Sequence, residues 1–191
     1  EQLFKNYSQL ILNNQESLWE IAFEPNQGET DNAGTWATYN GPIVAAPGEY
    51  PGTSNYMGRA NAFFLVLPYW KTFYETNDDG TPKDQRRDVN FVDYAYVWNA
   101  STETQNKTYT NSAINNAYRY PGKWRREWMA LGFVDPNNTG VNYCPLRYAD
   151  VVLMAAEAYN ETGNTPEAWK LLNNVRERAG ATPITNANYN S

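Results

Sequence analysis

Apolar side chains recur every three to four positions along residues 147–180, which is the spacing of one face of an α-helix. Two such runs are separated by Gly163, and the second opens with Thr165 and Pro166, a hydroxyl cap and a proline suited to the first helical turn. The pattern therefore predicts two antiparallel helices joined by a tight turn. The apolar positions are Val151, Val152, Ala155, Ala156, Tyr159, Ala168, Leu171, Leu172 and Val175.

The predicted hairpin also has the length and spacing of a tetratricopeptide unit. Only one copy is recognisable, and Gly180 stands where the pattern ends in proline. A single unit does not bury its own apolar face, so we expect it to pack on other helices. A plain helical hairpin in an α-rich domain is the alternative. The matching positions are Tyr159, Gly163, Ala168, Leu172 and Val175.

Shorter elements are predicted upstream. Residues 3–11 have helical spacing, and residues 68–74 read as a helical turn. Trp19, Ile21 and Phe23 alternate with polar or small residues, which predicts a half-buried strand. Residues 88–98 are the best strand candidate, with apolar side chains on both faces. We interpret both faces as core, with an aromatic face turned to a ligand as the alternative. That aromatic face carries Val92, Tyr94, Tyr96 and Trp98.

These patterns divide the chain into three parts. Residues 1–145 form a loop-rich mixed region with an opening helix and short strands, 146–180 the helical hairpin, and 181–191 a tail expected to be unpacked. Residues 25–61 are dense in glycine, proline and asparagine, and so long a loop in a compact domain is usually functional or disordered. The expected fold class is mainly α, with irregular loop-rich regions and a few short strands. Because the sequence opens inside an apparent helix without a signal peptide, we expect a fragment of a longer single-domain protein.

The composition favours stacking and amide hydrogen bonding over nucleic-acid binding. The 191 residues include 7 Trp, 15 Tyr and 7 Phe, and asparagine is abundant. Flat rings and amides suit a sugar surface, although rings are also ordinary core material. A net charge of −6 argues against a nucleic-acid binder, which needs a basic footprint. The basic and aromatic run at residues 119–128 is expected to form salt bridges and ring contacts inside the fold, with single-strand binding as the alternative.

The sequence lacks residues that several kinds of catalytic and metal-binding site require. The chain has no histidine, which removes the usual general base and the commonest zinc ligand. Cys144 is the only cysteine, so no intrachain disulfide forms. Two turns, beginning at Glu75 and Asp135, approximate calcium-binding loops, but Arg86 and Leu146 stand where a bidentate glutamate is needed. We therefore expect neither a metal nor a cofactor, although an irregular calcium site remains an alternative.

The enzymatic alternative is a glycoside hydrolase, which needs two carboxylates about 5–9.5 Å apart. Glu20 and Glu24 share a predicted strand face, but four residues at ~3.3 Å each separate their backbones by ~13 Å. Glu157 and Glu161 are neighbours on a helix surface instead of in a pocket. We therefore expect no catalytic residues, and carboxylates distant in sequence keep the hydrolase as an alternative.

Charged residues beside the apolar stripe of the hairpin have two interpretations. Arg147, Asp150 and Glu157 would either bind a ligand or form ion pairs with neighbouring helices, Arg176 and Arg178 included. We favour ion pairing, because charged side chains seldom bury without partners.

The hairpin resembles the signature of the SusD/RagB family. Residues 147–154 (RYADVVLM) and 172–180 (LNNVRERAG) carry most of the resemblance, which is close over 147–180. Upstream, residues 16–23 (ESLWEIAF) look like the short strand of the family, and residues 84–88 (DQRRD) look like its turn into a strand. Three landmarks in the right order make the resemblance specific.

The resemblance implies an outer-membrane, cell-surface lipoprotein that binds glycans without catalysis. It also implies delivery of oligosaccharide to a SusC-like TonB-dependent transporter, and a lipid anchor outside this chain. No family motif identifies contact residues, so the candidates are aromatic residues in loop-rich segments. These are Trp36, Tyr39, Trp70 and Trp98. A protein-interaction or structural module is the alternative function.

Overall fold

The computed structural model describes residues 2–11, 15–24, 34–47, 52, 54–67, 70–109, 119–129, 131 and 137–188, without the side chains of residues 70 and 71. Its elements, in chain order, are α1 (Gln2–Ser8), β1 (Ser17–Ile21), α2 (Trp36–Asn40), α3 (Trp70–Phe73), α4 (Arg86–Asn90), β2 (Phe91–Val92), β3 (Tyr94–Asn99), β4 (Thr104–Tyr109), β5 (Tyr120–Pro121), the 3-10 helix η2 (Arg126–Trp128), β6 (Tyr143–Arg147), α5 (Tyr148–Glu161) and α6 (Thr165–Arg178).

The predicted helical hairpin is present as α5 and α6. Gly163 connects them with a φ of +80°, a left-handed conformation that glycine adopts without strain. Ala156 and Ala168 are buried where small side chains let the two helices approach. At the start of α5, the Asp150 carboxylate accepts a hydrogen bond from the Arg147 backbone N–H at 2.9 Å. The hairpin is therefore built from the local signals that the sequence carries.

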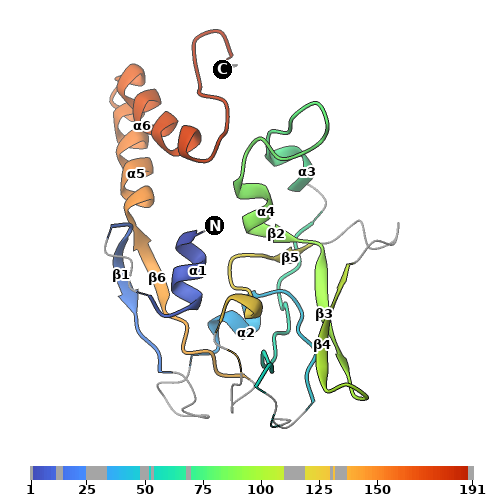
Figure 1. The fold of residues 1–191 in the computed structure, drawn as a ribbon. Helices are drawn as coiled ribbons and strands as arrows, with labels where there is room; N and C mark the ends of the chain where they lie inside the picture. The colour runs from blue at the N-terminus through green and yellow to red at the C-terminus, as the bar shows by residue number, and fades with distance from the viewer. Residues whose placement is uncertain are drawn as a thin grey trace.

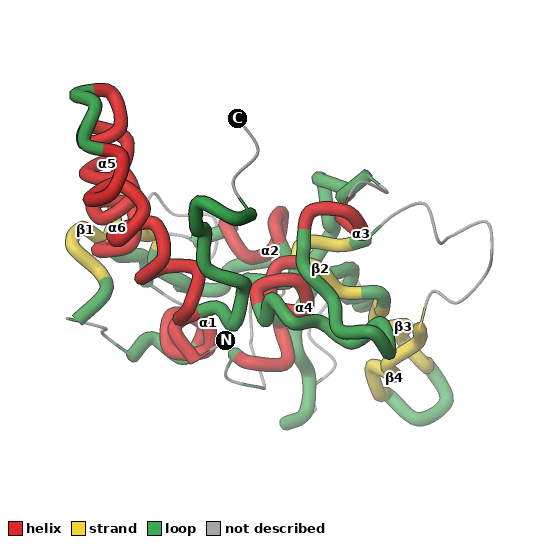
Figure 2. The backbone as a smooth tube through the Cα atoms, turned by 90° about the horizontal axis from the view of Figure 1, so that it is seen from above, coloured by secondary structure: helices red, strands yellow, loops and turns green. Residues whose placement is uncertain are grey.

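Among the described residues the strands form separate antiparallel pairs, β1 with β6, β2 with β5 and β3 with β4. The α5–α6 hairpin and the β3–β4 ribbon lie at opposite ends of the molecule, as both views show (Figure 1, Figure 2). Helices α1, α2 and α4 and strands β2 and β5 lie between them. The site must therefore be built on short elements and the loops that connect them.

Two strand predictions need correction. The strand predicted over residues 88–98 is interrupted, because residues 88–90 belong to α4 and Asp93 separates β2 from β3. Trp19 and Ile21 were expected to be half-buried, but they are 60% and 41% exposed. Strand β1 pairs only with β6, with irregular register, so a two-stranded ribbon leaves this face uncovered among the described residues.

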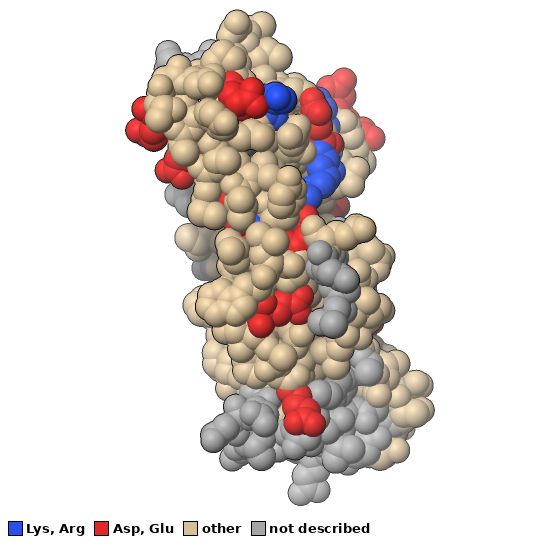
Figure 3. All heavy atoms as spheres, turned by 90° about the vertical axis from the view of Figure 1, so that its left-hand side faces the viewer, with Lys and Arg blue, Asp and Glu red and all other residues tan. Residues whose placement is uncertain are grey.

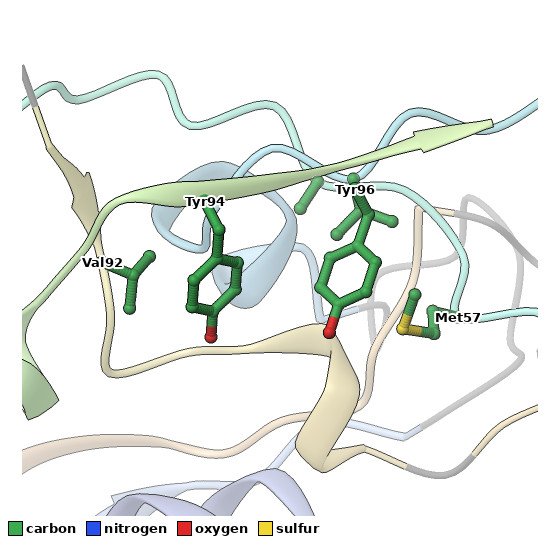
Figure 4. Packing of buried hydrophobic residues seen from close by; sticks show 6 residues of the cluster. Met57, Val92, Tyr94 and Tyr96 are labelled. Atoms are coloured by element: carbon green, nitrogen blue, oxygen red, sulfur yellow. The ribbon is translucent and has the colours of Figure 1, made fainter. Parts of the chain in front are cut away.

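The described core consists of two clusters. One joins Tyr7 of α1 to Ala37, Trp124, Met129 and Val141. The other contains Val92, Tyr94 and Tyr96 of β2 and β3 together with Met57, which lies on a separate loop near Tyr96 (Figure 4). Val92, Tyr94 and Tyr96 of the aromatic face therefore pack into the core, as we interpreted it, but the opposite face is not core throughout, because Val97 is 51% exposed.

The segment after α6 is packed, contrary to our expectation of an unpacked tail. The Glu75 carboxylate accepts hydrogen bonds from the backbone N–H of Thr182 at 2.9 Å and from Arg176 at 2.6 Å. The amide of Asn173 binds the backbone of Ile184 through both its oxygen and its nitrogen. We call this connection between Glu75 and residues 176–184 the clasp. Side-chain hydrogen bonds of Glu75, Asn173 and Arg176 hold these residues. No local sequence pattern predicts such contacts between distant positions.

The ion pairs of the hairpin also differ from the prediction. Arg147, the last residue of β6, pairs with Asp150 in the first turn of α5, at 3.1 Å. Arg176 and Arg178 pair with Glu75 and Glu16 of the loop-rich region, at 2.6 and 3.0 Å. Glu157, which we expected to pair between helices, is exposed. The hairpin is thus tied to the loop-rich region at the end of α6.

None of the helices in the described ranges has the length and apolarity that a membrane span requires. The first two residues of the turn predicted to begin at Asp135 lie outside the described residues.

Candidate functional site

Two aromatic rings are stacked on the surface of the loop-rich region. Tyr39, near the end of α2, lies against Phe63 with ring centroids 4.7 Å apart and planes 14° apart. Both rings remain accessible, since Tyr39 is 38% and Phe63 65% exposed. Stacking at this distance covers one face of each ring with the other, so Phe63, the more exposed of the two, offers the larger accessible aromatic surface. We call this feature the ring pair.

The backbone fixes the ring pair from both sides. The N–H of Asn61 donates to the Thr38 carbonyl at 2.7 Å, and the N–H of Phe63 donates to the Tyr39 carbonyl at 3.0 Å. Between them, Ala62 has a φ of +46°, in the left-handed region that favours glycine. A non-glycine residue there costs about 1–2 kcal/mol. The two flanking hydrogen bonds maintain this strained turn, which places Phe63 over Tyr39.

Trp36 lies on the same short helix as Tyr39 but packs inward. Its ring contacts Tyr143 at 4.5 Å and Trp124 at 6.4 Å between centroids. The side chain is half-buried, and its indole N–H has no hydrogen-bond partner among the described residues. An unpaired buried donor is uncommon, because it costs free energy comparable to a lost hydrogen bond.

The other two predicted contact residues lie apart from Tyr39. Trp98 of β3 is half-buried and meets the Tyr56 ring edge to face at 6.3 Å. Trp70 begins α3, but its side chain is outside the described part of the structure. No ring contact joins any two of Trp36, Tyr39 and Trp98 among the described side chains. Among the described side chains, Trp36 and Trp98 are therefore separate from the ring pair, and the place of the Trp70 ring stays a prediction.

A second feature is a cavity of about 600 Å³ between α1, α4, the start of α5 and the end of α6. Its lining combines apolar side chains, among them Leu3 and Phe4 of α1, with amide and charged side chains, Glu16 included. The cationic side chains are Arg86, Lys123, Arg147 and Arg178.

The basic and aromatic run at residues 119–128 is used within the fold, as predicted. Arg126 is fully buried and donates from Nε to the Arg59 carbonyl at 2.8 Å. The Arg125 guanidinium lies 4.4 Å from the Trp128 ring centroid. These cations do not form a basic surface stripe, so single-stranded nucleic-acid binding loses its structural basis here.

Two described carboxylates of the loop-rich region, Glu127 and Glu20, have hydrogen-bond partners that are not carboxylates. Glu127 accepts a hydrogen bond from the Tyr94 hydroxyl, and Lys107 lies 4.0 Å from the same carboxylate. Burial, followed by the charge of Glu127, raises the pKa of Tyr96 to about 12, so this phenol stays protonated at neutral pH. Glu20 accepts a hydrogen bond from the Asn142 amide at 3.0 Å. Within the described ranges no group of three or more metal-ligating side chains is close enough to hold an ion.

Sequence reasoning missed two residues of these features. Phe63 was not among the candidates, yet the apolar residues Phe63, Phe64, Leu65 and Leu67 are all about half exposed or more. Several large apolar residues in succession beside a loop-rich segment were the available signal. Lys123 was hidden in the basic and aromatic run, and nothing local distinguished it from Arg125 or Arg126.

The fold and the arrangement of the hairpin are those of a known protein family. The SusD_RagB family model, the SusD family, matches residues 15–191. The chain belongs to the SusD family.

Individual relatives agree with this assignment. SusD-like protein P2 of Formosa agariphila is 32% identical over 123 residues, which cover 60% of this chain and 22% of the relative. A crystal structure of a SusD homolog from Bacteroides thetaiotaomicron has a TM-score of 0.69 and 27% identity, covering 97% of this chain and 37% of that one. This similarity confirms the predicted fold class.

A more distant structural neighbour is surface glycan-binding protein A from Bacteroides thetaiotaomicron in complex with laminarihexaose. It has a TM-score of 0.53 and 20% identity, covering 89% of this chain and 37% of that one. The chain spans about a quarter of the length of the curated relatives it matches, 22% and 27%.

Proposed function

We propose that this protein binds glycans through aromatic stacking, and that the ring pair of Tyr39 and Phe63 is a principal contact. Membership of the SusD family supports carbohydrate as the ligand class. The structural neighbour in complex with laminarihexaose gives further support. The single observation that carries the proposal is the exposed, nearly parallel ring pair, held by backbone hydrogen bonds.

The physical mechanism follows from the geometry of the rings. The C–H faces of a sugar ring are apolar and flat, and they bury well against a flat aromatic surface. Because strained backbone and two hydrogen bonds already hold Phe63 in place, little conformational freedom is lost on binding. Asn61 is exposed beside the pair and offers an amide to sugar hydroxyls.

The cellular context is part of the same proposal. The full-length protein is a lipid-anchored, outer-membrane protein of the cell surface, and it passes captured oligosaccharide to a SusC-like TonB-dependent transporter without cleaving it. Family membership supports this context.

The test is isothermal titration calorimetry with laminarihexaose and a panel of other neutral oligosaccharides. Tyr39→Ala and Phe63→Ala should each weaken the best ligand about tenfold, a change of ~1.4 kcal/mol. Phe73→Ala is the matched control, because Phe73 is 75% exposed on α3 but does not belong to the pair. Unchanged affinity in both ring-pair variants would remove this site.

The other predicted contact residues are tested in the same titrations. Trp36→Ala, Trp70→Ala and Trp98→Ala should weaken binding if their rings form a more extended surface with the ring pair. Circular dichroism of each variant distinguishes a lost contact from a lost fold, which matters most for Trp36, whose ring packs against Trp124 and Tyr143.

A protein-interaction module is the second candidate, favoured by one surface. The side of the molecule that carries β1, α5 and α6 shows scattered charged groups among larger uncharged areas (Figure 3). Trp19, Met154 and Tyr159 are 60%, 53% and 42% exposed on these elements. Exposed apolar patches mark contact surfaces for other polypeptides. If this were the whole function, no glycan in the panel would give a heat of binding.

A further inference from the structure

The cavity beside the hairpin contains a cation that is not neutralised. Of its four cationic side chains, three have carboxylate partners close by: Arg86 with Asp84 at 2.6 Å, Arg147 with Asp150 at 3.1 Å, and Arg178 with Glu16 at 3.0 Å. Lys123, the fourth, forms no ion pair or hydrogen bond with any of the described residues. Its contact is the Phe4 ring, 5.1 Å from the ammonium nitrogen.

The surroundings of Lys123 disfavour an unpaired charge. Burial, followed by the nearby Arg147 guanidinium, lowers the pKa of Lys123, and the Asp150 carboxylate offsets only part of this. A desolvated ammonium group without an anion is unfavourable, whereas the same group beside a bound anion gains a strong charge-assisted hydrogen bond. The cavity wall therefore favours a ligand that brings a negative charge.

The remaining lining suits a sugar ring. Four amide side chains, Gln2, Gln15, Gln85 and Asn90, line the cavity and can bind hydroxyl groups. Leu3 and Phe4 provide an apolar wall for a C–H face. A volume of about 600 Å³ lies within the usual range for small-ligand pockets.

We propose that this cavity binds an acidic sugar unit of the glycan, with Lys123 as the residue that selects its carboxylate or sulfate group. This inference rests on the proposed glycan-binding function and adds a substrate class to it. Because Arg86, Arg147 and Arg178 are each neutralised by their own carboxylate, Lys123 carries the charge in the described cavity lining that is left to attract the anion. The ring pair and the cavity then have separate roles, neutral stacking at one and charge recognition at the other.

The experiment compares acidic and neutral ligands of the same length. Trigalacturonate, a galactose trisaccharide carrying sulfate esters, and the uncharged galactose trisaccharide are titrated by calorimetry at low ionic strength. We expect at least one of the acidic sugars to bind about tenfold or more tightly than the neutral one. The preference should decrease as salt is added, because a cation supplies it. The two acidic probes distinguish a carboxylate subsite from a sulfate subsite.

Variants of Lys123 then test whether this residue causes the preference for acidic sugars. Lys123→Met should abolish the preference for acidic sugars, and Lys123→Arg should retain most of it. Lys170→Met is the matched control, since it removes the same charge from an exposed position of α6 outside the cavity. Circular dichroism and thermal unfolding of Lys123→Met show whether its fold is intact, and Lys123→Arg provides the comparison if that variant is unstable.

The outcomes separate this inference from the proposed function. Equal affinity for acidic and neutral sugars, unchanged in Lys123→Met, overturns the inference and leaves glycan binding in place. Acidic selectivity that persists in Tyr39→Ala but disappears in Lys123→Met supports it. Binding of no sugar by the wild-type protein overturns both.

Discussion

The helical hairpin and the loop-rich region of this protein are held together in different ways. In the hairpin, α5 and α6 are joined by one glycine turn, and small residues bring their helices together. In the loop-rich region, elements of a few residues are connected by individual polar side chains. Arg126 is one such connection, since it reaches both the Arg59 carbonyl and the Thr38 hydroxyl.

This difference shows where stability is concentrated. A helix distributes its stability over many equivalent backbone hydrogen bonds, so the loss of one surface side chain changes little. Irregular backbone has fewer repeated hydrogen bonds, so each buried polar side chain that satisfies a carbonyl matters more. We therefore expect large effects from a few positions of the loop-rich region and small effects from most of the hairpin.

The largest effect is expected from Arg126→Met. Methionine retains much of the side-chain volume but leaves the Arg59 carbonyl and the Thr38 hydroxyl without this donor. The free energy of unfolding should fall by about 3 kcal/mol or more, measured by urea denaturation. Arg178→Met is the control, because its side chain is 55% exposed, and it should cost at most about 1 kcal/mol. A similar loss of unfolding free energy in both variants would contradict the proposed difference between the loop-rich region and the hairpin.

An intermediate effect is expected at the two glycines that terminate the hairpin helices. Gly163 and Gly180 have nearly the same φ, +80° and +79°. A Cβ at Gly163 meets nothing within 4 Å, whereas at Gly180 it lies 2.7 Å from the Lys83 carbonyl oxygen. Gly163→Ala should therefore cost only the backbone strain, about 1 kcal/mol, and Gly180→Ala about 2–3 kcal/mol.

Urea denaturation of the two glycine variants under the same conditions gives the difference between their free energies of unfolding. Equal costs would mean that the loop carrying Lys83 moves away easily, and that the end of α6 is only weakly attached to the loop-rich region.

The smallest of the three effects is expected at the clasp. Burial raises the pKa of Glu75, but hydrogen bonds from Thr182 and the charge of Arg176 outweigh it, so the pKa lies below its usual value. Because the folded-state pKa is depressed, the stabilisation is fully present above the ordinary glutamate pKa of about 4.3. It is lost as the pH falls through the lowered value.

Glu75→Gln tests the clasp at both ends of this pH window. At pH 7 it should reduce the free energy of unfolding by about 1 kcal/mol, since the carboxylate is partly exposed. The difference between wild type and variant should close as the pH falls below about 4. A difference that stays constant with pH would show that the charge of Glu75 contributes nothing to the clasp.

The sequence predicted the hairpin well because its signals are local. Helical spacing, Pro166 in the first turn and the glycine turn all act within a few residues, and α5 and α6 confirm them. The predicted hydroxyl cap at Thr165 is wrong, because α6 already begins at Thr165 and its N-cap residue, Asn164, forms no side-chain cap hydrogen bond. Strand burial was harder to predict. The alternation at Trp19 and Ile21 predicted a buried face, but burial depends on whether another layer covers the strand, and none does among the described residues.

The candidate site was predicted only in part, for a similar reason. Tyr39 was chosen for its aromatic ring in a loop-rich segment, but its partner Phe63 is more than twenty positions away along the chain. The contact requires the turn at Ala62, whose left-handed backbone no residue preference for alanine would predict. The polar residues that form the clasp and the cavity also come from distant segments, so their proximity appears only in the folded chain. The division into residues 1–145, 146–180 and 181–191 stays a prediction.

The strained alanine also bears on how fast a ligand is captured. In the proposed site the two rings are already stacked before a sugar arrives, so binding there would require no slow rearrangement of the loop. Replacing Ala62 with glycine would relieve the backbone strain but would also loosen the orientation of Phe63. The less strained variant would therefore be expected to bind the ligand less well.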